Sequence, residues 1–452
     1  MSEEVTLDKF AGSSDSDDSR EQLESRFWGE IPEGWELVNG SEVYEVNPNP
    51  KSAEEPNTYI EMDALDTELP YPKYFGERNA SEYSGKTFTK GDTLFARITP
   101  CTENGKAALV PEMDTEVGIG STEYAVLSPK TDRISPWLLY YLSKSYPIYN
   151  YAVSRMRGST GRQRVPFSVF RRELDIALPP LPEQRKIATV LHNVDQAIQK
   201  TEEIIEQTER AKQALMKSLF LEGYFDHEKT VDARHRNRLI QHPEKWDTKP
   251  AKKVMDVTRG AHPRPKSDDT LWGGEIPIIK ISDRNRGDSR TITSTDDTVT
   301  EKGSKDSKLV DEGTLIVSNA GTVGAARITG MKTCIHDHWL ILRNYEERLT
   351  TRYLYYFINW NQEFLEALAS GSTVLDLNTD DFRLFDITIP SLNEQRKVAD
   401  SIDSLHEQKM VNTRYAERLR HLKQGLMQDL LSGTVRTTDT NIEVPEEITQ
   451  YG

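Results

Sequence analysis

Two copies of one sequence block lie 211 residues apart in this 452-residue chain. The block LPPLPEQRKIATVLHNVDQAI begins at Leu178, and IPSLNEQRKVADSIDSLHEQK begins at Ile389. Further matches follow the same order in both halves, Trp35 with Trp246 among them, at offsets that drift between 211 and 221 residues. A repeat that keeps its order but not its spacing indicates a duplicated structural unit with altered loops. The chain therefore predicts two equivalent halves.

Each block opens a helical stretch of about 40 residues. Apolar or semi-apolar positions recur alternately at four and three residues, the 3.5-residue period of a supercoiled seam. They are Ile187, Leu191, Val194, Ile198, Thr201, Ile205, Thr208, Lys212, Leu215 and Leu219, then Val398, Ile402, Leu405, Lys409, Asn412, Ala416, Leu419, Lys423, Leu426 and Leu430. Prolines at 179, 180 and 182 favour a helix start, and Gly223 and Gly433 stand where the helices should end.

Two such helices, each roughly 60 Å long at about 1.5 Å per residue, are not stable alone in water. The first leads away from one half and the second leads back, so we expect an antiparallel coiled coil. Polar seam positions such as Thr201, Lys212, Asn412 and Lys423 would set its register. The alternative is that each helix only seals its own half.

The halves themselves mix short strands and helices, which predicts an α+β class. Strands are expected over 93–98, 124–129, 313–319 and 338–344, and helices over 137–144 and 352–370. The expected organisation is an acidic disordered tail over 1–26, a globular half over 27–181, a long helix over 182–221, a linker over 222–240, a second half over 241–391, a second long helix over 392–435 and an acidic tail over 436–452.

The composition is that of a globular chain, with 36% hydrophobic and 29% charged residues. No apolar run is long enough to span a bilayer, and the acidic N-terminus is unlike a signal peptide, so we expect a cytoplasmic protein. The net charge of −16 argues at first against a nucleic-acid partner. Residues 1–30 and 437–452 together hold −10 of it, and such acidic tails are usually solvated and disordered.

Three loop-like stretches are rich in basic residues. Residues 151–172 contain six arginines and no acid, residues 249–266 contain six basic residues and one acid, and residues 280–290 are mixed but arginine-rich. Arginine beside Gly, Ser, Thr and Asn suits phosphate contacts and the reading of guanine edges. A solvated basic surface is the alternative reading of each stretch.

Catalytic signatures are missing from the sequence. There is no phosphate-binding loop and no Asn-Pro-Pro-aromatic motif of an amino-methyltransferase, and Glu407-Gln408-Lys409, which matches the end of a nuclease motif, falls on the second long helix. Cys334, His336 and His338 alternate along an expected strand and could ligate zinc. A strand with half-buried polar groups is the preferred reading, because no further ligand pair has suitable spacing. We therefore expect neither catalytic residues nor a metal, and we read Cys101 and Cys334 as ordinary buried thiols.

The block at 178–198 and its following helix resemble the central conserved region of type I restriction–modification specificity subunits. The block at 389–409 and its helix resemble the C-terminal conserved region of the same subunits, and ARITPCTENGKAAL at 96–109 and the GST loops resemble segments of their target recognition domains. The resemblance spans about residues 28–436.

The resemblance implies that each half is a target recognition domain that reads one part of a bipartite, asymmetric double-stranded DNA target. The paired helices would set the unread gap and dock two methyltransferase subunits, which bring S-adenosylmethionine, while restriction motor–nuclease subunits add ATP- and Mg-dependent cleavage. The chain itself would bind no cofactor and have no catalytic activity.

Candidate residues follow from the basic loops and the helix starts. DNA contacts are expected at Arg97, Asn104, Lys106, Arg155, Arg157, Ser159, Thr160, Arg162, Arg164, Arg259, His262, Arg264, Lys266, Lys280, Arg284, Arg286, Asn319, Ser372 and Thr373. Partner docking is expected at Glu183, Gln184, Arg185, Lys186, Glu394, Gln395, Arg396 and Lys397.

Two other functions remain open from the sequence. The chain could serve a methylation-only or related defence system, or it could be a coiled-coil adaptor whose halves bind proteins. Sequence-specific DNA binding that weakens steeply with salt would argue against the adaptor.

Overall fold

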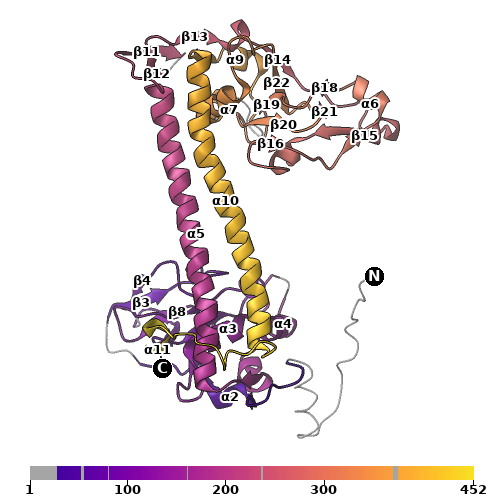
Figure 1. Cartoon of the computed structure of the whole chain (residues 1–452). Coiled ribbons are helices and arrows are strands. Elements are labelled where there is room, and N and C mark those ends of the chain that lie inside the picture. Colours follow the sequence, from indigo (N-terminus) through magenta and orange to yellow (C-terminus); the bar gives the residue numbers. More distant parts are fainter. Residues whose placement is uncertain are drawn as a thin grey trace. The chain divides into compact units, whose positions relative to one another are not determined.

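The computed structural model describes residues 28–51, 55–79, 81–159, 161–235, 238–369 and 375–451, with the backbone alone for 233–235 and 238–240. The expected acidic tail over 1–26 lies outside these residues. The chain divides into two compact units (Figure 1). Unit 1 combines residues up to Glu203 with those from Asn412 onward, and unit 2 is Ile204–Val411.

Unit 1 contains three small sheets. Strand β1 (Glu36–Asn39) pairs antiparallel with β10 (Asp175–Leu178). One four-stranded sheet has the order β2 (Tyr44–Val46), β9 (Tyr124–Pro129), β6 (Thr93–Ala96), β7 (Ala107–Leu109), and the other has the order β4 (Gly76–Arg78), β3 (Asn57–Ile60), β8 (Gly118–Gly120), β5 (Lys86–Phe88). The short helices are α2 (Gly40–Val43), α3 (Pro136–Lys144), α4 (Tyr146–Ser154) and η2 (Val169–Glu173).

Unit 2 repeats this plan. Strand β13 (Asp247–Pro250) pairs antiparallel with β23 (Asp386–Ile389), each 211 residues after its counterpart. The sheets are β14 (Asp256–Arg259), β22 (Trp339–Arg343), β19 (Leu315–Ser318), β20 (Ala326–Thr329), β16 (Thr291–Ile292), and β17 (Thr298–Val299), β15 (Trp272–Ile279), β21 (Thr333–Ile335), β18 (Lys308–Val310). Its short helices are η3 (Ala251–Lys253), η4 (Asp269–Leu271), η5 (Ile281–Asn285), α6 (Glu301–Lys305), α7 (Thr351–Trp360), α8 (Gln362–Leu368) and α9 (Thr379–Arg383).

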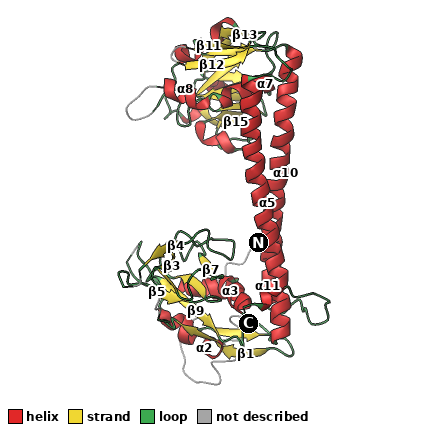
Figure 2. Ribbon diagram, turned by 90° about the vertical axis from the view of Figure 1, so that its left-hand side faces the viewer, coloured by secondary structure: helices red, strands yellow, loops and turns green. Residues whose placement is uncertain are grey.

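The four expected strands are all present, as β6, β9, β19 and β22, and the α+β class is confirmed (Figure 2). The single helix expected over 352–370 is instead α7 followed by α8. The break is at Asn361, a fully buried residue whose side-chain amide donates to the carbonyl of Phe357 at 2.9 Å. A side-chain bond to the backbone competes with continuation of a helix.

The two long helices are α5 (Leu181–Leu221) and α10 (Leu392–Leu431). In unit 1, the start of α5 lies against the end of α10, with Asp195 bonded to Lys423 and Glu202 to Arg420. In unit 2, the end of α5 lies against the start of α10, where Lys409 donates to Glu209 at 2.8 Å. The antiparallel pairing is therefore confirmed, and each helix start also packs into the core of its own unit.

Both helices stop as expected. Gly223 and Gly433 adopt positive φ of 88° and 73°, a conformation that glycine adopts without strain. None of the helices among the described residues is both long and apolar enough to cross a membrane.

Two expected segments differ from the structure. The linker expected over 222–240 contains the first strand, and half of the second, of a hairpin formed by β11 (Thr230–His235) and β12 (Arg238–Pro243). The C-terminal stretch is not a solvated tail: it forms α11 (Glu446–Thr449), and Ile448 is fully buried in the unit 1 core. The acidic composition of this segment gave no indication that Ile448 is buried. Burial of one apolar side chain is enough to anchor a short segment.

Candidate nucleic-acid interface

The repeated Glu-Gln pair at each helix start bonds inside its own unit. In unit 1 the Glu183 carboxylate accepts hydrogen bonds from the Trp35 indole at 3.0 Å and from the Arg436 guanidinium at 2.8 and 2.9 Å. Burial alone raises the pKa of Glu183, but the bonds from Arg436, Trp35 and the Thr437 amide outweigh it and lower the pKa. Gln184 accepts from the Ser135 amide at 2.8 Å and donates to two backbone carbonyls.

Unit 2 builds the same arrangement, which we name the helix-start latch (Trp35, Glu183 and Gln184, or Trp246, Glu394 and Gln395). Trp246 donates to Glu394 at 3.0 Å. Gln395 accepts from the Thr350 amide at 2.8 Å and donates to the carbonyls of Arg348 and Pro390. His227 takes the place of Arg436, with its Nε2 at 2.7 Å from Glu394.

The prediction that Glu183, Gln184, Glu394 and Gln395 dock a partner directly is wrong, because all four side chains are buried and bonded within their units. Lys186 is also engaged, donating to the carbonyls of Thr437, Thr438 and Thr440. Arg185 is half-buried, whereas Arg396 and Lys397 are exposed. The two exposed cations on α10 are the docking candidates that the structure leaves accessible.

In unit 1, part of the arginine-rich stretch 151–172 meets the loop that carries the candidates Arg97 and Asn104. The loop after β6 and the segment after α4 form an antiparallel bridge between Ile98 and Arg164, and the Thr99 amide donates to the Gln163 carbonyl at 3.0 Å. We name residues 97–105, 155–159 and 161–165 the unit 1 loop cluster. The fold thus brings together residues that are some 60 positions apart in sequence.

Some arginines of this cluster are paired with carboxylates, and others are exposed. Arg97 and Arg164 share the Glu123 carboxylate at 3.1 and 2.8 Å, and Arg155 binds Glu173. Lys106 donates to Asp63 at 3.0 Å, outside the cluster. Asn104, Arg157, Ser159 and Arg162 are exposed, while Thr160 lies outside the described residues.

Arg97 does not fit the expected DNA contact. Its side chain is only 14% exposed and is held by Glu123 and by the Val165 carbonyl. Its guanidinium lies 4.1 Å from the centre of the Phe167 ring, so it joins the two loops from within.

Unit 2 has an equivalent cluster. The loop after β19 bridges to a later segment through Ala320 and Asp376, in the way that Ile98 bridges to Arg164. Asp376 accepts from Arg259 at 3.2 Å and from Asn319 at 2.8 Å. Asn319 is fully buried, so its expected DNA contact is wrong: it holds the loop instead. We name residues 259–266, 319–324, 336–338 and 375–377 the unit 2 loop cluster.

The other expected contacts in unit 2 differ in accessibility. Lys280 pairs with Asp297 at 2.6 Å, Arg286 pairs with Asp283 at 3.2 Å, and Arg284 donates to Thr322. Arg264 and Lys266 are exposed, Arg264 with 76% of its side chain accessible. Ser372 and Thr373 lie outside the described residues.

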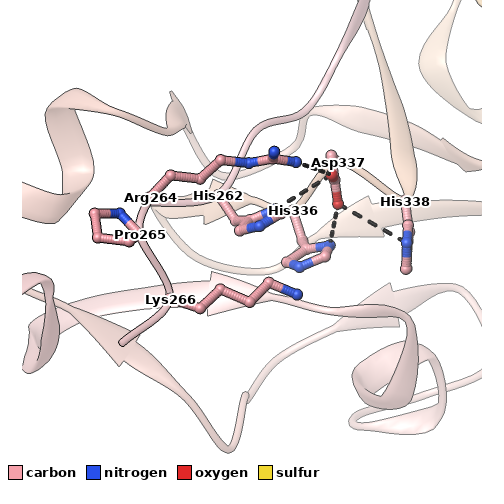
Figure 3. A pocket seen from close by; sticks show the side chains of 7 residues that line it. All are labelled: His262, Arg264, Pro265, Lys266, His336, Asp337 and His338. Carbon is pink, nitrogen blue, oxygen red and sulfur yellow. Dashed lines mark ion pairs between the residues drawn. The ribbon is translucent and has the colours of Figure 1, made fainter. Parts of the chain in front are cut away.

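Arg264 and Lys266 line a cavity of about 670 Å³ together with three histidines and an aspartate (Figure 3). His262 and His336 stack with their ring centres 4.4 Å apart, and Asp337 lies beside both. Burial lowers the pKa of His262, and it lowers that of His336 to about 4. The sequence pattern found His336 but not its partner His262, since 74 residues separate them.

A family model described as the type I restriction modification DNA specificity domain matches residues 32–210 and 243–418, one match for each half of the repeat. The chain belongs to this family. The two matches together cover most of the chain, and they include the latch and the loop cluster of both units. The repeat in the sequence is therefore explained by two copies of this domain, one in each half.

Curated relatives carry the same description. The chain is 25% identical over 424 residues to the MjaX type I restriction enzyme specificity subunit of Methanocaldococcus jannaschii, covering 90% of this chain and 95% of that protein. It is 34% identical over 162 residues to the EcoAI specificity subunit of Escherichia coli, covering 35% of this chain and 27% of that protein.

Solved structures agree on the fold. A chain from a study of complex assembly and conformational transition of the type I restriction–modification system matches with a TM-score of 0.58 at 22% identity, over 90% of this chain and all of that one. The type I S subunit from M. genitalium matches with a TM-score of 0.53 at 14% identity, over 89% and 97% of the two chains.

Proposed function

We propose that this chain is the non-catalytic subunit that selects the DNA sequence for a type I restriction–modification enzyme of the cytoplasm. One observation carries the proposal: both units share one fold and one helix-start latch, but their loop clusters carry different side chains. Equal scaffolds with unequal loops suit two readers of unlike sequences, because binding residues concentrate on loops held by a rigid scaffold.

The exposed residues of the loop clusters are our candidates for the DNA contacts. In unit 1 these are Asn104, Arg157, Ser159 and Arg162, and in unit 2 they are Arg264 and Lys266. The partly exposed arginines of the loop clusters, which pair with carboxylates in the free chain, can exchange the carboxylate for a DNA phosphate. The cost in free energy is small, since exposed ion pairs contribute about 0–1 kcal/mol. The acidic total charge is no obstacle, because binding depends on the local charge at the contact surface.

We further propose that Arg396 and Lys397 belong to the surface that receives one of two methyltransferase subunits, the carriers of S-adenosylmethionine. Motor–nuclease subunits would then supply ATP- and Mg-dependent cleavage. Both side chains are exposed on the second turn of α10, directly after the buried latch residues Glu394 and Gln395.

A unit swap tests the proposal. Residues 28–178 are replaced by the equivalent segment of another family member, together with residues 436–452, because the C-terminal segment packs on unit 1. The chimera is expressed with its methyltransferase subunit, and methylated bases are mapped across the host genome. We expect one half of the recognised sequence to change and the other to stay.

The reciprocal swap of residues 243–389 is the matched control and should change the other half. A chimera that alters both halves at once would contradict two independent readers. DNA binding that depends on neither the base sequence nor the salt concentration would favour the coiled-coil protein adaptor instead.

A further inference from the structure

Three potential metal ligands converge in the unit 2 loop cluster. His262 comes from the loop after β14, whereas His336 and Asp337 come from the turn between β21 and β22 (Figure 3). One ligand atom from each residue lies within 4.8 Å of the others. The two imidazoles are nearly parallel, at 7°, and their side chains are 4% and 8% exposed. The fold thus joins two distant segments through donor atoms buried together.

The donor atoms of the three residues lie close together. His262 Nδ1 lies 3.2 Å from Asp337 Oδ2, and His336 Nδ1 lies 2.7 Å from Asp337 Oδ1. Neither Nδ1 atom, nor Asp337 Oδ1, has a partner in hydrogen-bond geometry. Buried polar atoms in proteins almost always have a partner, so three orphaned atoms at one point need an explanation.

We propose that His262, His336 and Asp337 form a binding site for a divalent transition-metal ion of the zinc class. A cation at the centre accepts lone pairs from all three donors and requires no hydrogen-bond angles among them. In a tetrahedral zinc site with bonds of about 2.0–2.1 Å, neighbouring ligand atoms are about 3.3 Å apart. The donor atoms here are separated by 2.7 Å and 3.2 Å from Asp337 and all lie within 4.8 Å of one another, so small side-chain shifts would bring them to that spacing.

The ligand chemistry selects the metal. Two imidazoles and one carboxylate suit zinc and its neighbours, while magnesium and calcium prefer sets made of oxygen alone. Three protein ligands leave a fourth position for water or for an incoming group.

The trio differs from the one that the sequence pattern suggested. Cys334 is fully buried in a small apolar cluster with Ile278 and Val299, away from the donors. His338 is 44% exposed and its Nε2 lies 3.9 Å from Asp337 Oδ1, beyond the trio. The third donor is instead His262, which only the fold brings near.

A bound metal ion would cross-link two segments of the unit 2 loop cluster. It would join the loop that carries Arg264 and Lys266 to the turn at 336–338. Arg264 Nη2 lies 3.8 Å from Asp337 Oδ2, so a bound cation would release this exposed guanidinium for other contacts. Metal binding itself needs no DNA, so its test is separate from that of the proposed function.

Direct metal binding tests the site. The full-length chain is stripped with a chelator, and Zn²⁺ alone is then titrated against a chromophoric competitor. We expect one zinc per chain, and we expect His262→Asn and His336→Asn each to weaken binding by about 100-fold or more, since even partners of ligands contribute about 10–100-fold. The control is His421→Asn, an exposed histidine of unit 1.

Two further measurements guard against loss of folding. Co²⁺ added to the unaltered chain should give the visible absorption of a four-coordinate site, and Asp337→Asn, which keeps the side-chain volume, should abolish it with the circular dichroism unchanged. No zinc uptake by the unaltered chain at about 100 µM free metal, a concentration far above the sub-micromolar dissociation constants of structural zinc sites, would overturn the proposal. Zinc lost in Cys334→Ser but kept in His262→Asn would overturn it as well.

Discussion

At the scale of single residues, two glutamines have the same role in both units. Gln184 and Gln395 each accept from one backbone amide and donate to two backbone carbonyls, with lengths between 2.8 and 2.9 Å. Each thereby ties the start of a long helix to the loop before a short one. The sequence repeat identified these two glutamines. Their role follows from their burial and hydrogen bonds, because recurrence shows that a side chain is required but not what it contacts.

Removing one glutamine should loosen one unit. Gln395→Ala leaves the Thr350 amide and two carbonyls without their partner, which should lower the free energy of unfolding of unit 2 by about 2–4 kcal/mol. Urea unfolding of the full-length chain measures it. Asn393→Ala, an exposed neighbour on the same turn, should change stability by less than about 0.5 kcal/mol. Equal effects of both substitutions would contradict the latch.

At the scale of elements, four of the strands and both long helices were predictable because periodicity and stop signals are local. The loop clusters were not, since the pairing of Ile98 with Arg164 or of Ala320 with Asp376 depends on how the sheets place distant loops. The same limit applies to the basic stretches: charge counts do not show that Glu123 holds two arginines or that Asn319 is buried.

The pairing of α5 with α10 in unit 2 depends on a polar contact. Glu209 accepts from Lys212 and Lys409, each at 2.8 Å. Burial alone would raise the pKa of Glu209, but these bonds and one from Gln213 outweigh it and lower the pKa to about 2. A carboxyl whose pKa is depressed in the folded state stabilises the fold above its ordinary pKa and loses that effect as the pH falls.

Glu209→Gln should therefore destabilise unit 2 at pH 7 by about 1 kcal/mol, a value reduced for partial solvent exposure. The difference from the unaltered chain should shrink as the pH is lowered from 5 towards 2. Thermal unfolding across this range measures it. The control is Glu206→Gln, whose exposed pair with Arg210 should contribute little at any pH. A pH-independent difference for Glu209→Gln would contradict the assignment.

At the scale of the whole molecule, unit 1 is built from both ends of the chain. Leu430, Leu431 and Ile448 complete its core, and Glu447 bonds to His192 Nε2 at 3.0 Å and to the Tyr71 hydroxyl at 3.1 Å. Composition predicted only the acidity of this segment. Its anchoring could not be seen, because the pocket for Ile448 is formed by residues far away in sequence.

Ile448→Ala should destabilise unit 1 by about 2–4 kcal/mol, the usual range for a fully buried isoleucine. Hydrogen exchange should show faster exchange of amides in unit 1 and unchanged exchange in unit 2. Asn441→Ala, at an exposed position of the same segment, is the control and should leave both unchanged. Equal loss of hydrogen-exchange protection in both units would show that the C-terminal segment does not stabilise unit 1 specifically.

The divided make-up of unit 1 has a consequence for synthesis on the ribosome. Unit 2 is one continuous stretch, Ile204–Val411, and all of it emerges before the last core residues of unit 1. Unit 1 must wait, with an incomplete core, until Ile448 has left the ribosome. A chain that ends prematurely keeps that apolar surface exposed, which marks it for chaperones and proteases. The position of Ile448 thus makes synthesis of all of unit 2 a condition for a finished first unit.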